Sequence, residues 1–151
     1  MKTPQQGIRA LCKSEKFEPV SYKDSGGIWT IGYGTIRLDG KPVVAGQRIT
    51  QERATDELVR FVSGLEAGIT SALGRAPTSQ SEFDAFINLA YNIGLPGFLG
   101  STALKRHIDG NKKGCAEAIG WWNKVNGKTV QGLVNRRNRE VQMYLNGIYA
   151  M

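Results

Sequence analysis

The feature that most restricts the fold of this chain is an abrupt change of pattern at Pro19. Proline disfavours the helical conformation in the residue before it, so the helix expected upstream ends at or before Glu18. Two strand-like segments follow, residues 20–23 and 28–33, and a turn with two glycines at 24–27 separates them. A helix that runs directly into a β-hairpin predicts an α+β fold rather than an all-helical one.

The rest of the chain returns to a helical period after a second short turn. Asp39-Gly40 separates residues 35–38 from 42–44, which extends the hairpin into a small antiparallel meander. From Thr50, apolar residues recur every three or four positions as far as Gly74, so a long helix is expected there. Further helices are predicted from a capping box at Ser79 and Glu82, then at 101–108, 114–122 and 134–145.

These patterns predict one domain, residues 1–151, with an α/β lobe (1–50), a connecting helix (51–74) and a helical lobe (75–151). No apolar run is long enough to cross a membrane, and the first residues do not resemble a signal peptide. Cys12 and Cys115 are isolated, so no metal site, cofactor or redox pair is expected. Both thiols are expected to lie on helices and to contribute to helix packing. The single histidine, His107, is expected at the surface.

The net charge of +7 is unevenly distributed. Residues 100–139 contain nine basic and two acidic residues, and the rest of the chain is balanced. Such a basic segment favours an anionic partner, such as a nucleic acid, a membrane surface or an acidic wall polymer. A solvated basic face with no specific partner is equally consistent with the charge alone.

Three residues near the change of pattern are candidates for chemistry. Glu15 falls on the apolar face of the first helix, seven residues after Ile8, where partial burial would favour the protonated form that a general acid needs. The alternative is that Glu15 lies in a frayed last turn and reaches water. Glu18 is the other candidate for the acid, but it lies off the apolar face of the helix. Asp24 begins a turn, where aspartate is common because its side chain bonds to the nearby backbone. Taken alone, Thr30 is an ordinary strand residue.

The spacing of Glu15, Asp24 and Thr30 resembles the catalytic triad of the phage-type lysozymes, the endolysins or muramidases of glycoside hydrolase family 24. The residues around Asp24 and Thr30 are similar to that family's strand signature. Further similar motifs follow in the same order over nearly the whole chain, at 88–94, 97–102 and 132–140.

The resemblance implies a lysozyme-like α+β fold and an enzyme that cleaves the β-1,4 bond between N-acetylmuramic acid and N-acetylglucosamine in peptidoglycan. Glu15 would protonate the leaving oxygen, and Asp24 would stabilise the oxocarbenium-like transition state. Asp24 and Thr30 would together position the attacking water. The resemblance also implies a cofactor-independent monomer that accumulates in the host cytoplasm and reaches the periplasm and wall with the help of a holin.

Other residues are candidates for binding substrate in the cleft that this family has between its lobes. Asn92 either holds an acetamido group or caps a turn. Tyr33 and Arg137 match family positions, but whether Arg136 or Arg137 braces the lobe while the other faces cleft or solvent stays open. At least one of Trp121 and Trp122 is expected in the core.

One departure from the family pattern is Thr35, which stands where several relatives have histidine. A stabilising ion pair of those relatives is therefore not expected here. Competing readings are a silent wall-binding protein, a lytic transglycosylase, which needs no second carboxylate, and a nucleic-acid-binding module. The last is disfavoured because the basic residues show no reading motif.

Overall fold

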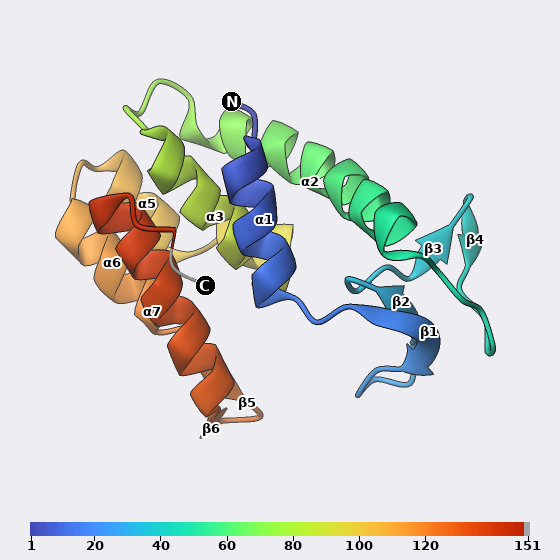
Figure 1. The fold of residues 1–151 in the computed structure, drawn as a ribbon. Coiled ribbons are helices and arrows are strands. Elements are labelled where there is room, and N and C mark those ends of the chain that lie inside the picture. The colour runs from blue at the N-terminus through green and yellow to red at the C-terminus, as the bar shows by residue number, and fades with distance from the viewer. Residues whose placement is uncertain (150–151) are drawn as a thin grey trace. The chain divides into compact units, whose positions relative to one another are not determined.

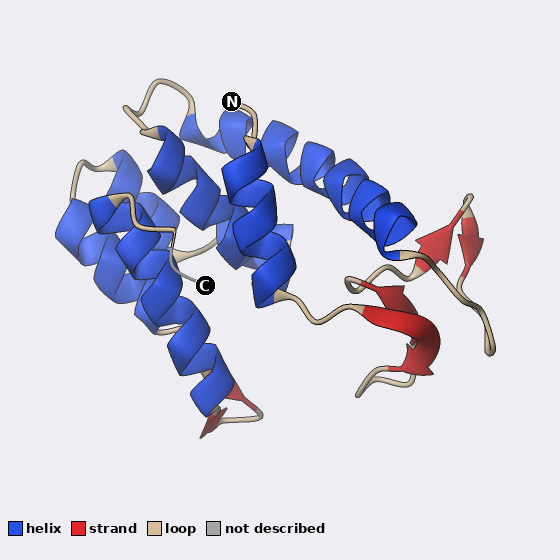
Figure 2. Ribbon diagram, viewed as in Figure 1, coloured by secondary structure: helices blue, strands red, loops and turns tan. Residues whose placement is uncertain are grey.

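A computed structural model describes residues 1–149 of the chain (Figure 1). Between these residues, seven α-helices and three two-stranded antiparallel sheets form the fold, so the predicted α+β class is confirmed (Figure 2). Contacts divide the chain into two compact units, residues 11–61 and residues 1–10 with 62–151. We call the first the hairpin unit and the second the helical unit.

The hairpin unit contains all three predicted catalytic residues. Two of its helices, α1 and α2, continue into the helical unit. The predicted meander is present as two separate hairpins, β1–β2 and β3–β4. The elements of the hairpin unit are the end of α1 (Gln5–Ser14), β1 (Glu18–Lys23), β2 (Trp29–Gly32), β3 (Arg37–Leu38), β4 (Lys41–Pro42) and the start of α2 (Gln51–Leu73).

Strand β1 is the centre of the hairpin unit. On one side it pairs with β2, where Tyr22 lies opposite Thr30. On its other side runs the extended segment 44–49, because Ser21 N–H donates to the Gln47 carbonyl at 2.9 Å and Ile49 N–H donates to the Pro19 carbonyl at 2.9 Å. The change of pattern at Pro19 thus marks the start of β1, the strand that joins the other two extended segments.

The predicted turn and helix signals are confirmed in the hairpin unit. Asp39 and Gly40 both have positive φ, 51° and 76°, as a tight hairpin between β3 and β4 requires. Thr50 caps α2, since its Oγ1 accepts from Arg53 N–H at 3.1 Å. Thr35, the departure from the family pattern, forms a backbone bridge with Ile31 in both directions.

The helical unit packs around α3, whose predicted capping box at Ser79 and Glu82 is present. Helix α3 contacts both α7 and α4, and α6 contacts both α5 and α7 (Figure 1). Gly68 of α2 is required by close packing, because a Cβ there would lie 2.7 Å from Leu95. Its elements are α3 (Gln80–Ile93), α4 (Leu95–Leu99), α5 (Thr102–Ile108), α6 (Lys112–Gly120), β5 (Lys124–Val125), β6 (Lys128–Thr129) and α7 (Gln131–Asn146).

Two elements of the helical unit were not predicted. Helix α4 begins at Leu95, and Pro96 lies in its first turn, where proline needs no N–H partner. The β5–β6 hairpin turns at Asn126 and Gly127, which have φ of 51° and 78°. An Asn-Gly pair is a strong signal for such a turn, so the sequence did contain this information.

The expectation that His107 lies at the surface is wrong, because only 2% of it is exposed. Its ring packs edge-on against Phe86 at 4.9 Å between centroids. One ring nitrogen, Nδ1, lies 2.7 Å from the Tyr144 hydroxyl, and Nε2 lies 2.8 Å from Thr78 Oγ1. Since the Thr78 hydroxyl donates to the Ala76 carbonyl, Nε2 carries the proton and Nδ1 accepts from Tyr144.

The expectation that at least one of Trp121 and Trp122 lies in the core is also wrong. They are 51% and 37% exposed. Helix α6 ends at Gly120, so the two rings are not presented on a helix face. The Trp121 ring instead stacks with the Arg106 guanidinium at 4.8 Å. The thiol prediction holds for Cys115, which is buried in α6, and Cys12 lies half-buried in α1.

A buried ion cluster stabilises α7. Glu140, 1% exposed, lies 2.6 Å from Arg137 Nε and accepts from Arg137 Nη2 at 2.9 Å. Arg136 Nε donates to Glu140 at 3.4 Å and to Asn88 Oδ1 of α3 at 3.1 Å. Both arginines are buried, so neither faces open solvent. One carboxylate therefore compensates two desolvated guanidinium groups.

Replacing Glu140 with glutamine keeps the shape of the side chain and removes the charge that the two arginines share. We expect the free energy of unfolding, measured by urea denaturation, to fall by about 3 kcal/mol. Glu117, exposed on α6, provides the control, since Glu117→Gln should change it by less than about 0.5 kcal/mol. Similar values for the two variants would contradict a stabilising role for the cluster.

His107 predicts a pH dependence of stability. Burial, and then the nearby Lys112 charge, lower the pKa of His107 below its ordinary 6.5, with Glu82 opposing. On acidification the unfolded chain therefore takes up a proton before the folded protein does. The stability gained from neutral His107 is complete above pH 6.5 and is lost as the pH falls toward the folded-state pKa.

We expect the free energy of unfolding to fall between pH 6.5 and 5, with a contribution from His107 of at most about 1.4 kcal/mol per pH unit. Urea denaturation at several pH values measures the slope. The slope should be smaller in His107→Gln, because this variant lacks the titrating ring. Identical slopes in the two proteins would exclude His107 as the source.

Candidate active site

Asp24 is fixed at the start of the β1–β2 turn by its own carboxylate. Its Oδ1 accepts from Gly26 N–H at 2.8 Å and from Ile28 N–H at 2.9 Å. Its backbone N–H donates to the Ile28 carbonyl at 2.9 Å and so closes the hairpin. Within residues 1–149, both side-chain bonds use Oδ1, which leaves Oδ2 available to a ligand. Both interpretations of Asp24, turn former and chemical group, are therefore compatible.

Thr30 is linked to Asp24 through Ile28, to which both residues bond. It lies on β2, 4% exposed, and its hydroxyl donates to the Ile28 carbonyl at 2.9 Å. Because the hydroxyl proton is used in this bond, Thr30 Oγ1 can only accept from a further partner. Asp24 Oδ2, at the start of the turn, and Thr30 Oγ1, on β2, are therefore two acceptors of one hairpin, and both side chains bond to Ile28.

Glu15 and Glu18 differ in their surroundings. Helix α1 ends at Ser14, and Glu15 follows directly, half-buried, with its N–H bonded to the Leu11 carbonyl at 3.0 Å. Glu18 lies on β1, and its carboxylate forms an ion pair with Lys16 at 3.2 Å. The Glu18 carboxylate is therefore already engaged with a cation.

Tyr22 lies within the electrostatic reach of three carboxylates. Its pKa is raised by partial burial first and then by the charges of Glu18, Asp24 and Glu15. Tyr22 lies on β1, directly opposite Thr30. The position of Tyr22 among three carboxylates could not be derived from spacing alone.

The predicted substrate-binding residues occupy different environments. Asn92 is exposed near the end of α3. That end of the helix is capped by Gly94, whose N–H donates to the Ala90 carbonyl. Tyr33 is 3% exposed, with its ring 5.5 Å from Phe17 and its hydroxyl accepting from Gln51 at 3.2 Å. Arg137 is 1% exposed and also donates to the Trp122 carbonyl at 3.2 Å.

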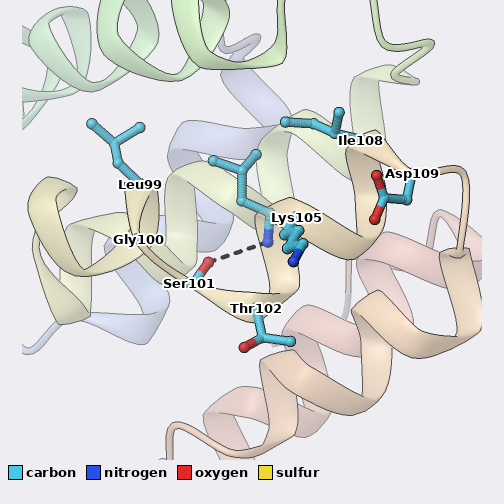
Figure 3. Close-up of a pocket in the computed structure, with 8 residues that line it drawn as sticks. Leu99, Gly100, Ser101, Thr102, Lys105, Ile108 and Asp109 are labelled. Atoms are coloured by element: carbon cyan, nitrogen blue, oxygen red, sulfur yellow. Dashed lines mark hydrogen bonds between the residues drawn. The ribbon is translucent and has the colours of Figure 1, made fainter.

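The helical unit contains a shallow hollow of about 360 Å³ between α4 and α5 (Figure 3). Leu99 and Ile108 supply apolar surface, and Lys105 and Asp109 supply one charge of each sign. Ser101 at its floor caps α5 by accepting from Leu104 N–H at 3.2 Å. None of the predicted catalytic or binding residues lines this hollow.

Across residues 1–149, there is no group of three or more His, Cys, Asp or Glu side chains that could hold a metal ion. None of the helices in the same range combines the length and the apolar character needed to cross a membrane.

Comparison with known proteins identifies the family of this chain. The family model described as phage lysozyme matches residues 12–140. An endolysin of Salmonella phage P22 is 37% identical over 146 residues, which are 96% of this chain and 99% of that protein.

Solved structures extend the similarity to the fold. An endolysin from Escherichia coli O157:H7 phage FAHEc1 superposes with a TM-score of 0.92 at 46% identity, covering 100% of this chain and 98% of that one. The muramidase domain of SpmX from Asticaccaulis excentricus superposes with a TM-score of 0.83 at 28% identity, covering 96% and 98%. The chain therefore belongs to the phage lysozyme family.

Proposed function

We propose that this phage lysozyme hydrolyses the β-1,4 bond between N-acetylmuramic acid and N-acetylglucosamine in peptidoglycan by means of Glu15, Asp24 and Thr30. Membership of the family makes the protein a glycoside hydrolase of the endolysin type, whose substrate is bacterial peptidoglycan. The observation that carries the residue assignment is the pair of acceptors, Asp24 Oδ2 and Thr30 Oγ1, held through Ile28.

The two carboxylate oxygens of Asp24 have different roles. Oδ1 is held by two backbone N–H groups, so the carboxylate is oriented before substrate binds and needs no reorganisation. Oδ2 then supplies negative charge where the oxocarbenium-like transition state develops positive charge. A carboxylate held in this way stabilises the transition state more than a freely rotating one.

Thr30 and Asp24 together orient the attacking water. A water between them donates one proton toward Asp24 Oδ2 and the other toward Thr30 Oγ1, since the threonine hydroxyl already donates to Ile28. The water oxygen then directs a lone pair toward the sugar carbon. Asp24 accepts a proton from this water as the bond to carbon forms.

Glu15 supplies the proton that the leaving oxygen needs. Glu15 lies half-buried directly after the last residue of α1. The Asp24 carboxylate is oriented by two backbone N–H donors. One carboxyl that donates and one that stays charged are the pair that glycoside hydrolysis uses.

The remaining predicted residues support the site in different ways. We propose that Asn92, exposed on α3, contacts an acetamido group of the substrate. Arg137 and Tyr33 are buried, and their described bonds favour a structural contribution to binding. Arg137 positions the end of α6 through the Trp122 carbonyl, and Tyr33 links β2 to the first turn of α2 through Gln51.

We also propose that the protein acts as a monomer on the cell wall and reaches it through a membrane opened by a holin. This setting follows from similarity to phage endolysins. The principal competing activity, lytic transglycosylation, uses one glutamate and needs no second carboxylate. The presence of Asp24 and Thr30 as two fixed acceptors of one hairpin favours hydrolysis over that reaction.

Product analysis tests the proposed reaction directly. Hydrolysis of purified peptidoglycan should give new reducing ends that carry the mass of one added water. A product with a 1,6-anhydro end would identify a transglycosylase instead. Binding without any new end would favour the silent wall-binding protein.

Glu15→Gln removes the proton donor and keeps the size of the side chain. We expect the rate of peptidoglycan cleavage to fall by about 10²-fold or more, because general acid catalysis contributes on this scale. Glu18→Gln is the matched control on the neighbouring strand and should keep the rate within a few-fold. If the two variants were equally active, Glu15 would not be the acid.

Asp24→Asn separates the two functions of that side chain. The amide oxygen can still accept from Gly26 and Ile28, so the melting temperature should stay within a few degrees of the wild-type value. The cleavage rate should nevertheless fall by about 10²-fold, since the negative charge is lost. Asp56→Asn, exposed on α2, is the control. Full activity in Asp24→Asn would refute the proposed role.

A further inference from the structure

We propose that a hollow in the hairpin unit binds the peptides that branch from the glycan of peptidoglycan. The hollow has a volume of about 600 Å³ and lies between the β3–β4 hairpin, the segment 44–49 and the first turn of α2. The inference rests on the proposed function, because it requires peptidoglycan as the substrate.

The charges of the hollow are suited to a carboxylate. Lys41 and Arg48 both line it and are exposed, and within residues 1–149 neither forms an ion pair with an acidic side chain. Arg53 lines it too, but its guanidinium is already bound to Asp39 at 3.0 Å and to Glu57 at 3.4 Å. Two cations therefore remain to bind an anion, because the charge of Arg53 is already compensated by Asp39 and Glu57.

The other lining residues favour a peptide over a simple anion. Leu38, Pro42 and Val44 supply apolar surface beside the two cations. A phosphate group would gain little from this surface, whereas a short peptide with methyl side chains and free carboxylates would use both parts. The peptides of peptidoglycan have this composition. Lys41 and Arg48 would bind a carboxylate, and the apolar residues would contact the small side chains.

The hollow is within reach of the proposed catalytic hairpin. The segment 44–49 lines it and runs along β1, held by the bonds between Ser21 and Gln47. Strand β2, which carries Thr30, lies on the other side of β1. Two strand spacings separate the two edges, about 10 Å. About three residues of extended peptide span that distance, which is the length of a short branch from the glycan.

The test compares two substrates, peptidoglycan glycan with its peptides and the same glycan after an amidase has removed them. The measured quantity is the KM on peptide-bearing glycan relative to the KM on bare glycan. In Lys41→Gln/Arg48→Gln we expect this ratio to rise about tenfold, the loss expected for two exposed ion pairs. Lys113→Gln/Lys124→Gln removes the same charge from the helical unit and should keep the wild-type ratio.

A second comparison tests the chemistry of the ligand. Peptide-bearing glycan whose carboxylates have been amidated should lose the advantage over bare glycan in the wild type, and the double variant should be insensitive to amidation. Polyphosphate is added as a competing ligand. If it inhibited cleavage by the wild type but not by the double variant, and the two proteins had the same KM ratio, a phosphate polymer would be the ligand and the inference would be wrong.

The outcomes also separate this inference from the proposed function. Equal KM ratios in wild type and double variant, with both glycans cleaved, would overturn the peptide site alone. Failure of the wild type to cleave either glycan would overturn the proposed function and the peptide site together. Melting temperatures of the variants verify that each one is folded.

Discussion

The bonds from Gly26 and Ile28 to Asp24 Oδ1 are the interaction on which the hairpin unit depends. They close the turn between β1 and β2, and the Ile28 carbonyl in the same turn also holds the Thr30 hydroxyl. Strand β1 in turn orders the segment 44–49 along its other edge. The same carboxylate thus determines the geometry of the scaffold and presents an oxygen for chemistry. A substitution at this position that changed shape as well as charge would disturb both at once.

The sequence predicted elements well where local chemistry determines the backbone. Pro19 ends the helical pattern, Ser79 and Glu82 begin α3, and Thr50 begins α2, because each signal acts within a few residues. Pro96 shows the limit of such signals, since the same residue can end one helix or begin the next. The sequence also identified Asp24 and Thr30 as candidates. It could not show that Ile28 links them, because that depends on how the turn closes.

Burial was the property that the sequence predicted least well. His107 is buried because Phe86, Tyr144 and Thr78, distant in the chain, surround its ring. Glu140 and the arginines that share it are buried for the same kind of reason, whereas two adjacent tryptophans are exposed because α6 ends before them. Hydrophobicity alone does not decide these positions. A polar side chain enters the interior when its partners are supplied there, and those partners come from other helices.

The distribution of charge illustrates why a count along the chain is a poor guide to a binding surface. Residues 100–139 contain the whole net charge, yet several of these cations are already used. Arg136 and Arg137 share Glu140, Lys112 is bound to Glu82 at 2.8 Å, and Arg106 stacks on Trp121. The hairpin unit, which lies outside this basic segment, instead exposes two cations beside an apolar surface. Recognition of an anion depends on charges that remain unpaired at one place, and only the folded structure reveals where those are.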